Sequence, residues 1–289
     1  MRFLKVFLST SILYVLIFAG GSQFSACKKT EIEHDTTTVI KHDTTTVIKH
    51  DTTTILDSTY ALKDGLVAYY NFNNGNLNDS SGNGNNIFFN NAVKANDRFG
   101  RANNAYLFDG TSSYMQVKNS STLNINNNIS LMAFVKLNGF YQGLNHANQI
   151  FMKGASDQSP GVYGLRILPS TGDCCTPGAG DTTKELLSGL YGDNSIVAIS
   201  DNTYFVRTNK WVSVVFTFDG YRAKIYVDGD LKNTVNGSAV FNANGSDLFI
   251  GKTENSTYPF IFNGVIDEIR IYSKTLSASD VRLLSNLKQ

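Results

Sequence analysis

The segment FNGVIDEIRIY, residues Phe262–Tyr272, alternates apolar and polar side chains over most of its length. This period of two is typical of a β-strand that turns one face to a core and the other to solvent. The segment IYVDG, residues Ile225–Gly229, alternates in the same way and ends in Asp-Gly, which supplies the positive φ of a tight turn. Both segments predict antiparallel strands joined by short turns.

Further strand-like segments recur at short intervals between Asn/Gly-rich and Asp-Gly turns. They are Leu66–Phe72, Ala105–Phe108, Tyr114–Lys118, Ile129–Leu137, Gln149–Lys153, Val162–Leu168, Trp211–Phe218 and Asp247–Ile250. One helix is predicted over Ala278–Leu287, with Ser277 as its N-cap and Val281 and Leu284 on one face. The pattern predicts an all-β fold, an antiparallel jelly-roll β-sandwich with a short C-terminal helix, over residues 63–289.

Composition excludes several classes of function. The 289 residues carry 25 basic and 24 acidic side chains, a net charge of +1, so no basic surface for nucleic acid is expected. Hydrophobic residues make up 42% and charged residues 17%, which suits a globular protein. His146 is the histidine of the predicted domain, and no Gly-x-Ser-x-Gly segment accompanies it. A His-based catalytic triad is therefore not expected.

The N-terminus has the pattern of a secretory signal. Two basic residues within Met1–Lys5 precede the apolar segment Val6–Ala19, which is short for a membrane span. The sequence Phe-Ser-Ala that follows, before Cys27, resembles a bacterial lipobox. We expect residues 1–26 to be a lipoprotein signal peptide and Cys27 to carry the lipid that anchors the chain to a membrane. The alternative is an ordinary signal peptide followed by a chance cysteine.

A repeat with a period of eight residues follows Cys27. His34–Lys41 reads HDTTTVIK, His42–Lys49 is identical, and His50–Asp57 reads HDTTTILD. The β-branched residues disfavour helix, and the apolar content is too low for a core. We expect residues 27–62 to form an extended stalk. The alternative is that the repeated His-Asp pairs bind a metal.

The predicted domain resembles a known family. Its segments match the LamG-like jelly rolls of the concanavalin A-like lectin/glucanase superfamily from Gly65 to about Leu287. The similar segments are GLVAYYNFNNGNLNDSSGNGNN (Gly65–Asn86), FDG with YMQV (Phe108–Gly110 and Tyr114–Val117), KWV leading to IYVDG (Lys210–Val212 and Ile225–Gly229), and FNGVIDEIRIY followed by Leu276-Ser277. The resemblance implies the sandwich fold, and it implies either a lectin or adhesive module or a glycosidase.

The acidic residues do not favour a glycosidase. Retaining glycosidases need two carboxylates about 5–5.5 Å apart. The domain contains Glu185, Glu254 and Glu268, and none lies in the Glu-x-Asp-x-x-Glu pattern that retaining glycosidases of this sandwich use. Asp267 and Glu268 are adjacent, so we expect them to point to opposite faces of one strand. The sequence therefore predicts no enzymatic activity.

Sugar binding, which the resemblance implies, needs aromatic side chains on loops. Phe140 and Tyr141 are candidates together with four tyrosines, and Trp211 is expected in the core. The predicted ligand-binding residues are Tyr163, Tyr191, Tyr204 and Tyr258.

A structural Ca²⁺ site is predicted from the oxygen-rich loop Asn78–Asn83 and from Asp267 in the closing strand. Asp79 and Asp267 would supply carboxylate ligands. The alternative is that Asp79 caps a turn and Asp267 pairs with an arginine.

The adjacent Cys174 and Cys175 could form a strained vicinal disulfide or remain two thiols.

These features together predict a lipoprotein at the outer membrane or cell surface. Its non-catalytic LamG-like module would bind a glycan or a glycosylated partner. The competing interpretation is a structural or adhesive module that binds protein without binding sugar, and a glycoside hydrolase is the least favoured.

Overall fold

The structure is a computed structural model that describes residues 28–31, 38–42, 45–50, 53–56, 62–141, 143, 147–156, 159–169, 185–193, 196–200 and 206–287. The chain divides into two compact units, Met1–Asp64 and Gly65–Gln289. Within the described ranges, no helix has the length and apolar content needed to cross a membrane.

The first unit contains a four-stranded antiparallel sheet, and the last three of its strands come from the repeats. Its strands, in spatial order, are β1 (Lys28–Glu31), β2 (Thr38–His42), β3 (Thr45–His50) and β4 (Thr53–Leu56). The β-branched residues therefore form strands, as their propensity favours. Each repeat pairs with the next, with Val39 opposite Ile48 and Ile40 opposite Val47. This pairing differs from the single extended stalk expected from the sequence, because consecutive repeats can satisfy one another's backbone groups.

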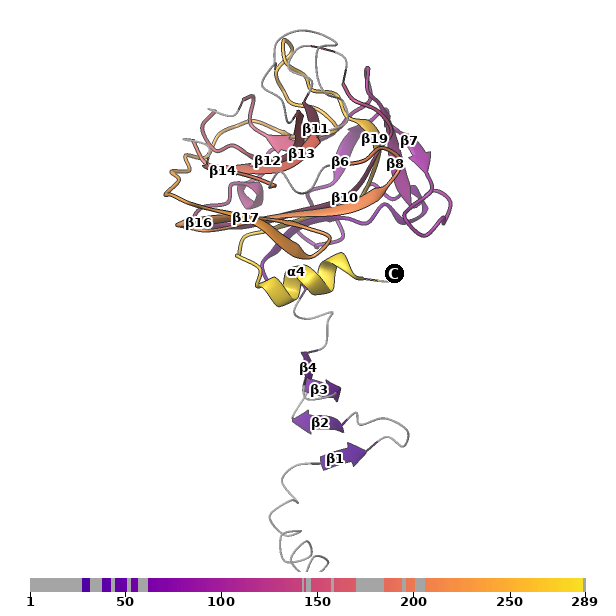
Figure 1. Cartoon of the computed structure of the whole chain (residues 1–289), viewed down its shortest axis with the longest axis vertical. Helices are drawn as coiled ribbons and strands as arrows, with labels where there is room; N and C mark the ends of the chain where they lie inside the picture. The colour runs from indigo at the N-terminus through magenta and orange to yellow at the C-terminus, as the bar shows by residue number, and fades with distance from the viewer. Residues whose placement is uncertain are drawn as a thin grey trace, which may run out of the picture. The chain divides into compact units, whose positions relative to one another are not determined.

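The second unit is a sandwich of two antiparallel sheets (Figure 1). The first has eight strands in the order β17-β16-β15-β10-β19-β8-β7, and β5 also pairs with β19. These are β5 (Leu66–Tyr70), β7 (Val93–Ala95), β8 (Ala105–Asp109), β10 (Asn128–Leu137), β15 (Trp211–Asp219), β16 (Arg222–Val227), β17 (Asp230–Asn236) and β19 (Asn263–Tyr272).

The second sheet of the sandwich has seven strands in the order β14-β13-β12-β11-β18-β9-β6. These are β6 (Ile87–Asn90), β9 (Met115–Val117), β11 (Asn148–Lys153), β12 (Tyr163–Pro169), β13 (Glu185–Tyr191), β14 (Ile196–Ile199) and β18 (Leu248–Ile250). Short 3₁₀ helices occupy Asn73–Gly75 and Ser121–Leu123. The predicted all-β jelly-roll sandwich is confirmed.

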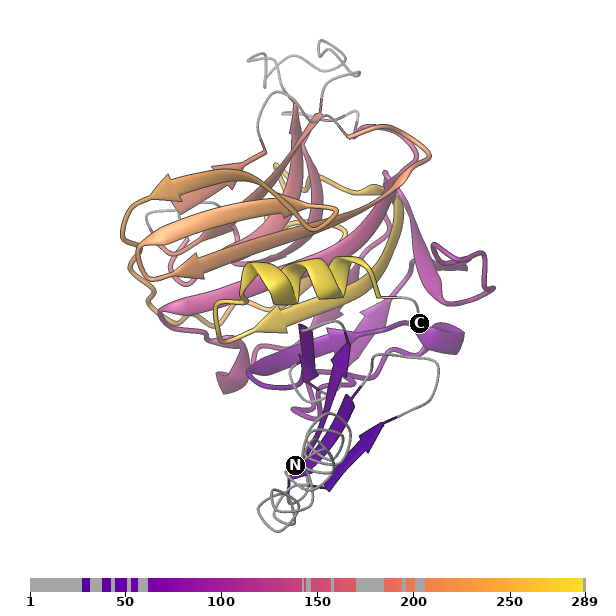
Figure 2. The same cartoon turned by 60° about the horizontal axis from the view of Figure 1, so that its bottom comes forward.

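One α-helix, α4 (Ala278–Ser285), follows the last strand. Ser277 accepts a hydrogen bond from the Asp280 backbone N–H, and the Asp280 carboxylate accepts one from the Ser277 backbone N–H, so the predicted N-cap is a full capping box. Val281 and Leu284 are buried. Figures 1 and 2 show that α4 lies along the outer face of the eight-stranded sheet.

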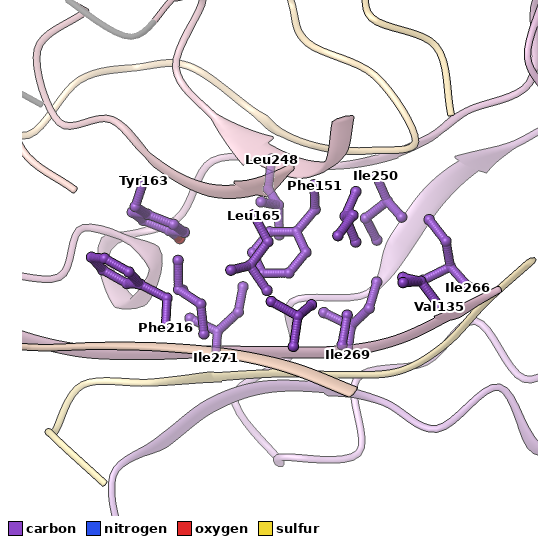
Figure 3. Packing of buried hydrophobic residues seen from close by; sticks show 14 of the residues in the cluster. Val135, Phe151, Tyr163, Leu165, Phe216, Leu248, Ile250, Ile266, Ile269 and Ile271 are labelled. Atoms are coloured by element: carbon purple, nitrogen blue, oxygen red, sulfur yellow. The ribbon is translucent and has the colours of Figure 1, made fainter. Parts of the chain in front are cut away.

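The core lies between the two sheets. Alternate residues of β10 and β15 point inward, and Figure 3 shows Leu165, Leu248 and Ile250 of the seven-stranded sheet facing Ile269 and Ile271 of the other. All five are completely buried, and burying one such side chain contributes about 1.5–3 kcal/mol. The core thus uses the inner face of each sheet, while α4 covers part of the outer face of the eight-stranded sheet.

Candidate functional surface

The outer face of the seven-stranded sheet carries aromatic side chains near one edge. In β18, Leu248 and Ile250 point into the core, so Phe249 between them points outward. In β9, Met115 and Val117 are core residues, and the alternation therefore turns Tyr114 and Gln116 outward.

Strand β6 adds two phenylalanines at the edge of this sheet. A register shift between Ile87 and Phe89 marks a β-bulge, so Phe88 has no partner of its own on β9. Ile87 enters the core, while Phe88 is 52% exposed and Phe89 is 37% exposed. We call the set Phe88, Phe89, Tyr114 and Phe249 the aromatic surface.

The rings of the aromatic surface contact one another. Phe89 stacks on Tyr114, with ring centroids 4.6 Å apart and an interplanar angle of 27°. Tyr114 lies 6.1 Å from Phe249, which is nearly buried and forms the base of the set. Lys252 Nζ lies 4.3 Å from the Tyr114 centroid, and Lys118 Nζ lies 5.0 Å from that of Phe88. The exposed ring area therefore belongs mainly to the two phenylalanines.

Polar groups fix the aromatic surface in place. The Asn91 side-chain oxygen accepts a hydrogen bond of 2.7 Å from the Tyr114 backbone N–H. Gln116 lies between Phe89 and Phe249 in the register and donates to Asp247 Oδ2 at 2.6 Å. These bonds hold the strands that carry the rings, so the aromatic surface is preorganised.

Two of the predicted ligand-binding tyrosines are core residues instead. Tyr163 and Tyr191 are both completely buried. Their hydroxyl groups donate to the backbone carbonyls of Leu123 and Ile125. Burial raises the pKa of Tyr191 to about 12. The prediction is wrong for both, because the register of β12 and β13 turns these rings toward the opposite sheet.

Tyr258 is the predicted tyrosine that the structure places at the surface. It is 39% exposed and lies 6.2 Å from the Phe260 ring, which Tyr141 contacts edge-on at 6.4 Å. Phe140 packs against the core. Tyr204 lies outside the described residues.

Trp211 is half-buried at the start of β15 and is not a core residue. It pairs with Lys136 of β10, whose Nζ lies 5.7 Å from the indole ring. The next residue, Val212, belongs to the core, so the alternation turns Trp211 outward.

Both carboxylate oxygens of Asp79 accept hydrogen bonds from strand β5 and from the loop that follows Asp79. Oδ1 accepts from the backbone N–H groups of Tyr69 and Ser81, each at 2.9 Å. Oδ2 accepts from the Ser81 hydroxyl at 2.7 Å and from the Asn85 N–H at 3.1 Å. Asp79 thus organises the loop and ties it to β5.

Asp267 lies on the outer face of the eight-stranded sheet. A β-bulge in β19, where Glu268 has a φ of 55°, places two residues between the core residues Ile266 and Ile269. The bulge turns both carboxylates outward, which corrects the expectation that they face opposite sides. Asp267 pairs with Arg98 at 3.1 Å.

Glu268 has partners of its own. Its carboxylate accepts hydrogen bonds from the Tyr69 hydroxyl at 2.9 Å and from Arg270 Nη2 at 3.1 Å.

No group of three or more His, Cys, Asp or Glu side chains that could hold a metal occurs in the described part of the chain. The calcium site stays a prediction. Cys27, Cys174 and Cys175 lie outside the described residues.

Comparison with known proteins identifies the family. The model of the concanavalin A-like lectin/glucanases superfamily matches residues 109–282, which is more than half of the chain. The chain belongs to the concanavalin A-like lectin/glucanases superfamily. The match covers the strands from β9 to β19 and includes Tyr114 and Phe249 of the aromatic surface, whereas Phe88 and Phe89 lie before it. A search of curated proteins returned no match.

Solved structures of this superfamily's fold are similar over most of the chain. Domain 4 of AbnA, a GH43 extracellular arabinanase from Geobacillus stearothermophilus in complex with arabinotriose, has 22% identity and a TM-score of 0.53, covering 76% of this chain and 98% of that domain. The binding domain of Paraclostridial Mosquitocidal Protein 1 has 18% identity and a TM-score of 0.55, covering 78% of this chain. The binding domain of botulinum neurotoxin serotype D/C has 16% identity and a TM-score of 0.56, also covering 78%.

These similarities establish the fold alone. The chain spans about half the length of the two toxin binding domains.

The aromatic surface of this concanavalin A-like domain was not predicted from the sequence. A signal for it exists in the pair Phe88-Phe89, because adjacent residues of a regular strand cannot both face the core. Alternation also indicates the direction of Tyr114. Met115 and Val117 are the apolar residues of a strand with a period of two, so Tyr114 and Gln116 belong to the opposite face.

Proposed function

We propose that this chain is a non-catalytic module that binds a glycan through the aromatic surface. The observation that carries the proposal is the exposure of Phe88 and Phe89 beside Tyr114 on an ordered sheet. An exposed ring offers an apolar face to the C–H groups of a sugar, and nearby amides and charged groups can bind its hydroxyls. The complex of the similar arabinanase domain with arabinotriose supports saccharide binding on this fold.

A non-catalytic role is supported by how the acids of β19 are used. Glu268 is held by Tyr69 and Arg270, and Asp267 is held by Arg98. A glycosidase needs one carboxyl group to protonate the leaving oxygen and a second to attack or to activate water. Both acids lie on the opposite sheet from the aromatic surface.

The test is saccharide binding by matched variants of the full chain. A glycan array finds a ligand, and calorimetry compares wild type with Phe89→Ala. Loss of the exposed ring should weaken binding about two- to tenfold, because aromatic stacking contributes roughly 0.5–1.5 kcal/mol. Tyr221→Ala is the control, since Tyr221 is 61% exposed in the turn between β15 and β16 of the other sheet. Equal weakening in both variants would reject the aromatic surface as the site.

Display at a membrane is the second part of the proposal. The signal-like N-terminus and Cys27 support a lipid anchor, with the domain held at the outer membrane or cell surface. Cys27→Ser should move the protein from the membrane fraction to the soluble fraction. A variant that stays in the membrane fraction after a high-salt wash would reject the anchor.

Protein binding without sugar is the second candidate function, and one observation favours it. Phe88 and Phe89 lie on the edge strand β6, and Val93, which is 63% exposed, lies on β7 at the edge of the other sheet. Exposed apolar edges of this kind can pair with another protein. A silent glycan array, together with a purified partner whose binding Phe89→Ala abolishes, would favour this function.

A further inference from the structure

Two lysine ammonium groups lie on the aromatic surface. Lys252 Nζ is 4.3 Å from the Tyr114 centroid and 5.2 Å from that of Phe249. Lys118 Nζ is 5.0 Å from the Phe88 centroid. Cation–π contacts of this kind hold each charge beside the exposed rings. A saccharide that stacks on Phe88 therefore lies next to the ammonium of Lys118, and one that extends over Tyr114 lies next to that of Lys252.

Neither lysine has a carboxylate partner in an ion pair within the described ranges. Arginines elsewhere in the sandwich do have such partners, as Arg98 has Asp267 and Arg270 has Glu268. The charges on the aromatic surface are thus available to a ligand, whereas the charges on the opposite sheet are used within the fold.

Two acids, Asp247 and Glu254, belong to the same segment of the chain as Lys252. Asp247 accepts hydrogen bonds from Gln116 and from the Asn119 backbone N–H, and both of its oxygens are engaged. Glu254 is exposed and interacts electrostatically with Lys252. Burial nevertheless dominates and lowers the pKa of Lys252, since its ammonium is partly removed from water. A charge in such surroundings attracts an opposite charge more strongly than one in bulk solvent does.

From this arrangement we infer that the aromatic surface selects acidic saccharides, with Lys252 and Lys118 binding the carboxylate or sulfate while Phe88 and Phe89 contact the sugar rings. The inference rests on the proposed glycan-binding function and names the ligand class. The two lysines flank the rings, so they determine specificity among saccharides that all stack equally well.

The experiment uses matched ligand pairs with the full chain. Tetragalacturonate is compared with its methyl ester, and a sulfated galactose tetrasaccharide with its desulfated form. We expect at least one acidic saccharide to bind about tenfold or more tightly than its neutral counterpart, because hydrogen bonds to charged groups are the stronger class. The difference should shrink as salt is raised.

Variants separate the roles of charge and stacking. Lys252→Gln should reduce the preference for the acidic form and leave binding of the neutral form nearly unchanged. Lys136→Gln is the control, because Lys136 also lies over an aromatic ring, Trp211, but on the other sheet. Thermal melting of each variant shows whether the fold is intact.

The outcomes distinguish the inference from the function on which it rests. Equal binding of acidic and neutral forms, weakened by Phe89→Ala, would overturn the acidic preference and keep the glycan-binding function. No binding of any saccharide would overturn both. Binding to anionic phosphatidylglycerol vesicles without binding to acidic saccharides would overturn the inference in favour of a lipid surface.

Discussion

Arg98 donates a hydrogen bond to Asp267 in the interior and so joins two segments that lie 169 residues apart in the sequence. Arg98 Nη1 lies 3.1 Å from Asp267 Oδ2, and the two side chains are 8% and 3% exposed. The guanidinium also lies 3.9 Å from the Phe134 centroid and donates to the Leu287 carbonyl. The pair therefore links the loop after β7, strand β19 and the chain that follows α4.

Stability should depend on pH through Asp267. Burial, followed by the charge of Glu268, raises the pKa of Asp267 to about 8, although Arg98 acts in the opposite direction. The folded state then binds more protons than the unfolded state between the ordinary pKa near 4 and pH 8. The stabilisation is thus fully present below about pH 4 and is lost as pH rises to 8.

Asp267→Asn tests this dependence, because asparagine resembles the protonated acid. Urea denaturation should show that the unfolding free energy falls less between pH 5 and pH 8 in the variant than in wild type. The contribution of Asp267 to the wild-type dependence is at most about 1.4 kcal/mol per pH unit. Identical slopes would show that Asp267 is ionised throughout as the partner of Arg98.

Lys153 should be a strong structural tether. Its side chain is completely buried, and Nζ donates to Asn119 Oδ1 at 2.9 Å, Asn244 Oδ1 at 3.0 Å and the Ser246 carbonyl at 2.8 Å. Lys153→Met leaves these acceptors without their donor and should lower the unfolding free energy by about 2–4 kcal/mol. Chemical denaturation measures this loss of unfolding free energy, and Lys224→Met, at a half-buried lysine, is the control. A loss no larger than in the control would contradict the tether.

Gly189 should be required for sheet packing. A Cβ at this position would overlap the ring of Phe216, which is completely buried on the facing sheet. Gly189→Ala should therefore destabilise the domain by about 1–3 kcal/mol. Gly245→Ala should have little effect, because nothing lies within 4 Å of its added Cβ. A double variant with Phe216→Leu should lose less stability than the sum of the two single changes, and strict additivity would refute the overlap.

The calcium prediction and the loop role of Asp79 can be separated by melting experiments. Asp79→Ala removes four hydrogen bonds and should lower the melting temperature whether or not metal is present. If Asp79 and Asp267 also share Ca²⁺, EDTA should lower the melting temperature of wild type by several degrees and that of the variant much less. Equal melting of wild type with calcium and with EDTA would leave Asp79 with its hydrogen-bonding role alone.

Local features of the sequence determined the elements of the sandwich. Alternation of apolar residues located β10, β15, β16 and β19, and Ser277 located the start of α4. These signals act within a few residues, so they can be read without knowing the neighbouring strands. The family also followed from such segments, since their order along the chain resembles that of its members.

Only the tertiary structure decided which aromatic and acidic side chains reach a surface. The sequence predicts Tyr163 and Tyr191 as ligand-binding residues, yet the pairing of β12 with β13 turns both into the core. The bulges at Phe88 and Glu268 each insert one residue and so reverse the faces of their neighbours. A single inserted residue changes side-chain direction because the strand period is two, and its position depends on hydrogen bonds to a partner strand distant in the sequence.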